Sequence, residues 1–508
     1  MNKIYPRRVL HILLLTVVFS IFFSCSAFNN TETLDLKKRI KKITLDNGMR
    51  VLLLKRQGAP VFSAQIKVKV GNVEEQAGSY GLAHFFEHLA FKGTETIGTT
   101  DYAKERALLD QIFKIGTEIV NLKKQKGDAA KIAALVTQRE QLEAEQKKLV
   151  VNNEFMQIYQ RHGSVDLNAT TANDFTTYYV SLPVNKLELW AYMESARFQT
   201  PVMRDFFTEV SVVAEERRSR IDNSPVGLLY EAFVDQSFDQ SPYGVMVVGP
   251  AADIQNYTPA VARAFYEKYY IPSRIVVSVV GNIDIKETEA IIRKYFSSIP
   301  AKEDPKNNFT HENFDPKTFP RKKVLTGPEQ PRFYLGYHRP AHPHDDDIIM
   351  DVIQDIMCSG RTSRLFKQLV LDTKKASFAG CYASIPGARL DNIFTFYVMP
   401  LKGHTNSELK KDIETEIEKL MTEGPSPYEL QRVKNSIDAD LVYSLQSNSG
   451  LASQLAFYES LTGSWEYIYT LQDRIHAITA DDVKRVLKTY FVESGEVAVY
   501  YELDKTSY

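Results

Sequence analysis

The chain has 508 residues, of which 44% are hydrophobic and 25% are charged, and its formal net charge is −1. This length is more than a single hydrophobic core usually serves, so we expect two domains of about 200 residues each. The near balance of acidic and basic residues gives no support for nucleic-acid binding, which usually leaves a basic excess.

The N-terminus has the pattern of a targeting segment. A short basic stretch precedes an apolar run over residues 9–23, which is too short for a comfortable membrane span. Next to this run stands Cys25, and a Cys at this point resembles a bacterial lipoprotein processing site with Cys25 as the lipidated residue. The alternative is signal-peptidase cleavage after Ala27. We expect a membrane-anchored lipoprotein of the bacterial cell envelope or periplasm, or, in the alternative, a secreted soluble protein.

The first folded segments read as strands. Residues 42–54 predict a hairpin whose turn lies at Asn47-Gly48. Residues 61–70 alternate between apolar and other side chains and predict a further strand.

The next segment carries the sequence His-Phe-Phe-Glu-His at residues 84–88. Read as a helix, His84 and His88 lie one turn apart on the same face, where two imidazoles can bind one zinc ion. Glu87 is close enough to reach a water on the same metal. Apolar residues on both sides of the motif would bury the helix and hold the rings still. The alternative is that two helix histidines meet by chance.

Residues 101–155 have the pattern of an antiparallel helical hairpin. Apolar residues fall at heptad spacing as far as Leu122, and a seven-residue repeat resumes at Ile132 after a turn near Gly127. Such a hairpin is either an arm that docks a partner or a solvated insertion that packs on its own domain.

Strand-like segments rich in Thr and Tyr follow at residues 163–171 and 175–180, and a long helical stretch, broken near Pro201, covers residues 185–220. A strand over 275–279 and a helix over 286–296 complete the first half. Three prolines among polar residues predict a linker. The predicted layout is a signal or lipoprotein segment (1–27), a tether (28–41), a first domain (42–300), a linker (301–321) and a second domain (322–508).

The second half repeats the order of the first, which suggests duplication, although the sequence similarity between the halves is too weak to prove it. A strand over 332–337 precedes a helix over 348–357, and the chain closes with a strand over 496–501. Cys358 and Cys381 could form a disulfide or remain as two buried thiols.

Three histidines near the start of the second half precede three aspartates at 345–347 and could form a metal-binding loop. Two prolines between them favour an irregular loop whose Asp residues cap the helix that begins near Ile348. The histidines are His338, His342 and His344.

Two histidines do not complete a catalytic zinc site, which usually has three protein ligands and an open position. Glu209 and Glu216 are seven residues apart and so share one face of a helix. A pair of carboxylates on an inward face is costly unless a cation compensates for it. The alternative is a solvent-facing helix end with Glu–Arg pairs, and the residues alone leave this choice open.

The order His-x-x-Glu-His, with a downstream Glu-(six residues)-Glu, resembles the inverzincin metallopeptidases related to pitrilysin, insulin-degrading enzyme and mitochondrial processing peptidase. The resemblance covers most of residues 40–500 and also includes Asn168-Ala169, 279–282 and 359–366. It is closest in layout to the short, two-domain bacterial members that look like processing-peptidase subunits.

This resemblance implies one zinc ion per chain, held by His84, His88 and Glu216, with Glu87 as the general base that activates a zinc-bound water. Glu209 would support the ligands without binding the metal itself. The distance in sequence between His88 and Glu216 exceeds the family norm, and the hairpin at residues 101–155 accounts for the excess as an insertion.

The resemblance also implies an α+β fold of two similar domains, each a mainly antiparallel sheet flanked by helices, which together form half of a clamshell. Asn168 and Ala169 would lie on the strand that pairs with the substrate backbone. The expected function is a zinc-dependent endopeptidase that cleaves extended oligopeptides or small unfolded proteins. The alternative is a non-catalytic peptide-binding or scaffold subunit, and an intact set of motif residues argues against it.

One departure from the family pattern concerns the second half. Active members commonly carry an Arg and a Tyr there that bind the substrate carbonyl region, whereas this chain has Val370 and either Ser377 or Phe378 at those places. We therefore expect the protein to work as a heterodimer with a non-catalytic pitrilysin-like subunit that supplies the pair. A homodimer is the alternative.

Overall fold

The structure is a computed structural model that describes residues 37–306, 309 and 319–504. The predicted signal segment with Cys25, most of the tether and part of the linker lie outside these residues. Within the described part of the chain, no helix combines the length and the hydropathy that a membrane span requires.

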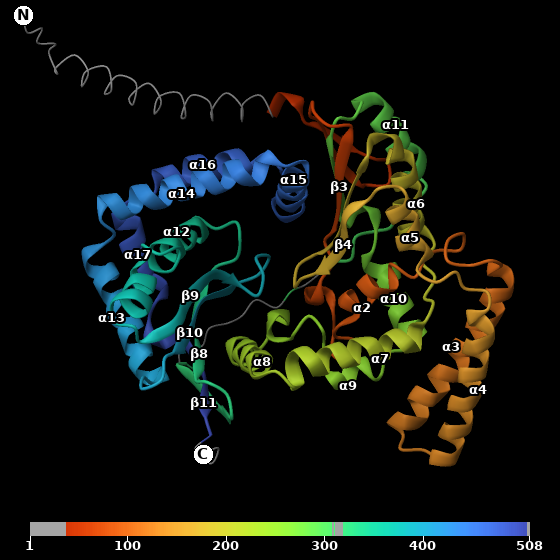
Figure 1. Cartoon of the computed structure of the whole chain (residues 1–508), viewed down its shortest axis with the longest axis horizontal. Helices are drawn as coiled ribbons and strands as arrows, with labels where there is room; N and C mark the ends of the chain where they lie inside the picture. Colours follow the sequence, from red (N-terminus) through yellow and green to blue (C-terminus); the bar gives the residue numbers. More distant parts are fainter. Residues whose placement is uncertain (1–36, 307–308, 310–318, 505–508) are drawn as a thin grey trace, which may run out of the picture.

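Two mainly antiparallel sheets form the framework of the protein (Figure 1), as the family resemblance implied. The first sheet has the strand order β1-β2-β6-β3-β5-β4, and only its β2–β6 pair is parallel. The predicted hairpin is confirmed as the antiparallel pair of β1 and β2. The bounds are β1 Lys41–Thr44, β2 Arg50–Lys55, β3 Val61–Val68, β4 Val165–Thr171, β5 Thr176–Pro183 and β6 Ile275–Gly281.

The second sheet has the order β7-β11-β8-β10-β9, with one parallel pair between β7 and β11. This order repeats that of the first sheet, strand for strand, without a counterpart of β1. The shared topology supports the duplication that the sequence suggested. The strand β7 begins at Arg321, inside the predicted linker, and the bounds are β7 Arg321–Gly327, β8 Arg332–Arg339, β9 Ala376–Ile385, β10 Asn392–Pro400 and β11 Glu496–Leu503.

Helices cover the faces of both sheets (Figure 1). Those of the first half are α2 Leu82–Leu89, α3 Tyr102–Lys124, α4 Ala129–Lys147, α5 Glu154–Arg161, α6 Leu187–Gln199, α7 Phe206–Arg217, α8 Pro225–Ser237, α9 Ala251–Ile254, α10 Pro259–Tyr269 and α11 Ile285–Phe296. Those of the second half are α12 Asp347–Met357, α13 Asn406–Glu423, α14 Pro427–Gln446, α15 Asn448–Thr462, α16 Tyr467–Ala477 and α17 Ala480–Tyr490.

The two halves exchange helices. From the first half, α8 packs on the second sheet, where the Phe233 ring stacks on Tyr334 at 5.1 Å between centroids. From the second half, α15 packs on β3 and β6 of the first sheet, and its fully buried Glu459 carboxylate pairs with Lys42 at 2.9 Å and Arg50 at 3.2 Å. Each sheet therefore completes its core with a helix from the other half. The predicted boundary between domains stays a prediction, because this exchange joins the halves into one packed unit.

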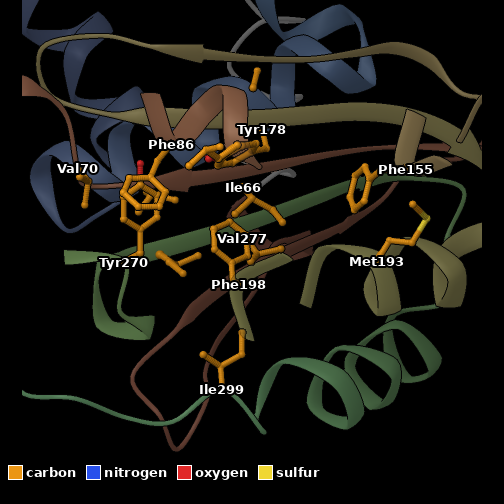
Figure 2. Close-up of a cluster of buried hydrophobic side chains, with 14 of the residues drawn as sticks. Ile66, Val70, Phe86, Phe155, Tyr178, Met193, Phe198, Tyr270, Val277 and Ile299 are labelled. Atoms are coloured by element: carbon orange, nitrogen blue, oxygen red, sulfur yellow. The ribbon is translucent and has the colours of Figure 1, made fainter. Parts of the chain in front are cut away.

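The predicted helical hairpin is α3 and α4, which project from the first half (Figure 1). Its base packs on α7, where the Phe207 ring occupies the space that a Cβ at Gly116 would fill. The predicted end of the insertion at residue 155 is too late, because Phe155 belongs to α5 and is buried in the first core. Figure 2 shows this core, in which Phe86 of α2 lies among side chains from the sheet and from residues near α10.

A disulfide joins Cys358, just after α12, to Cys381 on β9, with Cα atoms 5.7 Å apart. This pairing decides the alternative that the sequence left open. The aspartates before α12 do not cap the helix as predicted, since the N-cap residue Asp346 makes no side-chain capping bond. They make other contacts instead: Asp346 pairs with Arg485 at 2.6 Å, and Asp347 Oδ2 lies 2.5 Å from His342 Nδ1. The predicted loop includes His342 and His344 but not His338, which is buried on β8.

Candidate metal centre

The motif lies on α2, as predicted, and the start of this helix is held firmly. The carboxylate of Glu75 accepts hydrogen bonds from the backbone N–H groups of Gly81 (2.6 Å) and Ala83 (2.7 Å). Gly81 has a φ of 92°, a conformation that favours glycine. Phe85 and Phe86 are buried in the first core. Because Phe85 and Phe86 face the core, the two histidines lie on the other face of α2.

A stripe of four residues on α7 faces α2, at spacings of three, four and three. Phe206 packs edge-on against Phe85 at 5.0 Å, and Val213 is fully buried. The other two members of the stripe are Glu209 and Glu216. The exposed Glu215 pairs with Arg218 at the surface, as the solvent-facing alternative expects, whereas Glu209 and Glu216 are turned toward the histidines of α2.

Two histidines and one glutamate converge between α2 and α7. Glu216 lies 3.6 Å from His84 Nε2 through Oε1 and 3.4 Å from His88 Nε2 through Oε2. Candidate ligand atoms of all three residues lie within 4.8 Å of one another, and no other group of three His, Cys, Asp or Glu in the described residues comes this close. Two imidazole nitrogens and one carboxylate oxygen are a donor set that catalytic zinc sites use, so these residues fit the metal.

A cationic side chain also reaches Glu216. Arg220 Nη1 lies 2.6 Å from Glu216 Oε1, and the Arg220 side chain is 74% exposed. Burial lowers the pKa of His84 to about 4, so its imidazole is neutral near neutral pH and has a lone pair to offer.

Glu209 lies where a supporting carboxylate is expected. Its Oε2 is 3.3 Å from His88 Nδ1, and its Oε1 is 2.5 Å from Lys92 Nζ. Hydrogen bonds with Glu209 and then Glu216 raise the pKa of His88 to about 9. A carboxylate on the far nitrogen of a ligand imidazole fixes the ring's orientation and increases its basicity.

Glu87 lies beside the ligands and is held from β4. The Thr171 hydroxyl donates a 2.6 Å hydrogen bond to Glu87 Oε2. Burial raises the pKa of the Glu87 carboxyl, and the Thr171 bond opposes this rise. The sequence predicted a strand that includes Thr171 but assigned this residue no role. Its contact with Glu87 joins residues 84 positions apart, and no local pattern indicates such a contact.

Asn168 and Ala169 lie on β4, the edge strand of the first sheet. Asn168 is exposed and Ala169 is buried, and both pair with β5 on the inner side. The outer edge of β4 has no neighbouring strand in the described chain, so its backbone groups are available to an extended peptide. The strand ends at Thr171, which places this edge next to Glu87.

A pocket of about 260 Å³ opens beside the ligands and has mostly apolar walls. Many of its apolar residues come from α8, from the loop before α9 and from the second half. Nothing in the sequence indicated that these segments lie together. Two larger cavities, of about 340 and 880 Å³, contain none of the three ligands. The lining is His84, Thr171, Asn173, Glu216, Arg220, Ile221, Tyr230, Val234, Val245, Met246, Val247, Val248 and Pro386.

The second half has no Arg or Tyr at the places that the family pattern suggests. Val370 is half-buried and packs against the second core. Ser377 and Phe378 lie on β9, the edge strand of the second sheet, and both are exposed.

Comparison with known proteins identifies the family. Residues 50–118 match the profile described as insulinase (peptidase family M16), and residues 256–437 match the profile described as peptidase M16 inactive domain. A relative named zinc protease PqqE, from Helicobacter pylori, is 27% identical over 481 residues, which cover 91% of this chain and 92% of that protein.

Solved structures share the fold. A protease from Helicobacter pylori aligns with a TM-score of 0.77 at 24% identity, covering 91% of this chain and 99% of that one. The periplasmic protease PqqL from Escherichia coli aligns with a TM-score of 0.67 at 18% identity, covering 92% of this chain but only 48% of that longer chain. With its inverted zinc motif, its two matching sheets and its zinc-protease relatives, the chain belongs to the insulinase (M16) family of pitrilysin-like peptidases.

Proposed function

We propose that this protein is a zinc-dependent endopeptidase that cleaves extended oligopeptides or small unfolded proteins. One observation carries the proposal: His84, His88 and Glu216 converge from two helices, and Glu87 lies beside them. Relatives that bear the name zinc protease support it. A degenerate scaffold subunit, the alternative, would have no reason to keep four coupled residues in place.

The geometry supports a role for each residue of the site. His84, His88 and Glu216 would hold one zinc ion, and Glu209 would orient His88 through Nδ1. When bound, zinc supplies Lewis acidity that polarises a peptide carbonyl and acidifies a water molecule. Glu87 would take the proton from the attacking water and pass it to the leaving amine. Burial favours this proton transfer, since it raises the pKa of Glu87.

The outer edge of β4 would position the substrate. An extended peptide that adds to this edge through backbone hydrogen bonds lies beside Glu87, because the strand ends at Thr171. Asn168 and Ala169 would be part of this binding edge. Recognition through the backbone explains how such a site accepts many sequences.

Removing one ligand tests the metal site. A His84→Ala variant should bind far less zinc than the wild type and should lose peptide cleavage, because two donors seldom hold catalytic zinc. Zinc content of the purified proteins, measured by elemental analysis, checks this. Equal zinc content in the wild type and the variant would show that His84 is not a zinc ligand.

We further propose that the active form is a dimer with a non-catalytic pitrilysin-like subunit. Val370, Ser377 and Phe378 leave the second half without the Arg and Tyr of active members. This chain spans about half of the longer PqqL protein, and a separate structure of the first half of PqqL aligns with a TM-score of 0.66. A second pitrilysin-like unit would complete such an arrangement.

Assays of the purified chain test this pairing. Alone, with zinc bound, it should cleave peptides weakly, and addition of the partner should restore activity while shifting the mass in solution to that of a dimer. Full activity as a monomer would refute the need for a partner. An envelope location fits the proposal, since PqqL is named periplasmic, and lipidation at Cys25 would tether the protein there.

A further inference from the structure

A cationic side chain lines the pocket beside the candidate metal ligands. Arg220 lies in a π-helical turn, η3 Arg218–Asp222, which follows α7, and it shares the pocket with His84 and Glu216. Its backbone is held by α8, because a Cβ at Gly227 would come within 2.2 Å of the Arg220 carbonyl oxygen. Its side chain is largely exposed. The backbone of Arg220 is therefore fixed, while its guanidinium can reach a molecule bound in the pocket.

Three arginines follow one another closely here, and two of them have a carboxylate of their own. Arg217 donates a hydrogen bond to Glu231 at 2.9 Å. Arg218 donates one to Glu215, which precedes it on α7. Within the described residues, the single ion pair of Arg220 is with a candidate metal ligand, and it has no hydrogen bond to any other group.

The pairing of Arg220 with a candidate ligand has a consequence for the charge of the pocket. Arg220 Nη1 contacts Glu216 Oε1, the oxygen that also lies near His84 Nε2. A metal ion bound to Glu216 would reduce the negative charge that this carboxylate presents to Arg220, since a bound cation is the largest charge in such a site. The guanidinium would then be an exposed cation at the metal centre without a carboxylate dedicated to it.

The remaining lining suits an apolar group. Of the Asp, Glu, Lys and Arg residues in the described chain, only Glu216 and Arg220 line this pocket. Aliphatic side chains form much of its wall, such as Val234 of α8 and Val245 and Val248 of the loop before α9. Ligand sites commonly combine such apolar walls with a few polar or charged groups that orient the ligand. A ligand that fits this pocket therefore combines an apolar group with an anionic one.

We propose that Arg220 binds a carboxylate of the peptide substrate, next to an apolar substrate side chain held in the pocket. This inference rests on the proposed function, since it places the peptide at the same metal centre. A planar guanidinium binds a carboxylate through two parallel hydrogen bonds, which gives both affinity and orientation. Arg220 is therefore a specificity-determining residue of the proposed peptidase.

Two sources can supply this carboxylate in a peptide. An apolar residue at the C-terminus carries its own α-carboxylate, so that one residue would fill the pocket and pair with Arg220. An apolar residue inside the chain needs a neighbouring Asp or Glu, whose side chain supplies the same group. Peptides in which only the source of the charge differs distinguish the two.

Binding of uncleaved peptides tests the inference. The protein is the full chain, zinc-loaded and bearing Glu87→Gln so that the probes are not consumed. One pair of fluorescent peptides of Ser and Gly ends in Leu, with a free or an amidated C-terminus. A second pair is amidated and carries an internal Leu next to Glu or next to Gln. In at least one pair, we expect the carboxylate peptide to bind about tenfold more tightly than its neutral counterpart, as a charge-assisted pair would provide.

Variants of the turn assign the effect to one side chain. Arg220→Gln should keep its zinc and bind the two peptides of each pair alike, whereas Arg220→Lys should keep part of the preference because it keeps the charge. The matched control is Arg218→Gln, which removes an exposed arginine of the same turn that does not line the pocket. It should keep the full preference.

Three results would overturn the inference. The first is equal binding of charged and neutral peptides by the parent protein. The second is a preference that persists in Arg220→Gln, which would assign the carboxylate to the metal. The third is loss of zinc from Arg220→Gln, which would show that the arginine supports Glu216 rather than the substrate.

The outcomes for the two proposals are separable. If the wild type cleaves peptides but the binding assay shows no preference for a carboxylate, the role of Arg220 fails and the peptidase stands. If the preference is found and depends on Arg220, but the zinc-loaded wild type with its partner cleaves nothing, the peptidase fails and the carboxylate site stands.

Discussion

A Glu87→Gln variant is expected to keep its zinc and to lose turnover by about a hundred- to ten-thousandfold, the usual contribution of a positioned general base. Gln has the size and shape of Glu and can still accept the hydrogen bond from Thr171 through its amide oxygen. It cannot take a proton from water near neutral pH. The proposed metal ligands are untouched, so zinc content should equal that of the wild type.

Metal content and steady-state kinetics on the same preparation measure both effects. The matched control is Glu215→Gln, which removes an exposed carboxylate next to the ligand Glu216 but on the solvent side of α7. It should retain wild-type kcat. A Glu87→Gln protein with undiminished kcat would exclude Glu87 as the base. Loss of zinc in this variant would show that Glu87 contributes to zinc binding.

An Arg204→Met variant is expected to lose about 3–5 kcal/mol of unfolding free energy, because it leaves a buried carboxylate without its partner. Arg204 is 1% exposed and Glu105 is fully buried. The guanidinium donates to Glu105 at 2.7 and 3.0 Å. It also donates to the backbone carbonyls of Lys92, Thr94 and Ile97, in the loop that follows the motif helix. The variant removes all these bonds at once.

Chemical denaturation measures the loss. The control is Lys104→Met, next to Glu105 on α3, which breaks a surface pair with Asp101 and should leave the unfolding free energy nearly unchanged. A double variant, Glu105→Leu with Arg204→Met, should be more stable than Arg204→Met alone, since no unpaired charge remains. A double variant that is less stable than either single one would show that packing, not charge, dominates this site.

Local pattern was enough to predict several of the regular elements. The hairpin turn at Asn47-Gly48 and the helix carrying His84 and His88 depend on neighbours within a few residues, so their signals are present in the sequence. The end of the hairpin insertion was predicted too late. An apolar residue such as Phe155 can belong to a solvated hairpin or to a buried core, and only its packing in the first core tells them apart.

The choice between Glu209 and Glu216 shows where local reasoning stops. Both lie on the face of α7 that packs against α2, and helical spacing cannot rank them. The resemblance to a family ranked them. In the structure Glu216 faces both Nε2 atoms, whereas Glu209 faces His88 Nδ1. The difference depends on how two helices, far apart in sequence, are placed side by side.

The sequence by itself determined the motif, the helices and strands that carry it, and the resemblance that names zinc as the expected metal. These follow from periodicity and spacing, which are properties of near neighbours along the chain. Only the tertiary structure decided the contact of Thr171 with Glu87, the exchange of α8 and α15, and the pocket beside the candidate metal ligands. Such contacts join residues tens or hundreds of positions apart, and the position of each partner depends on the packing of every element between them.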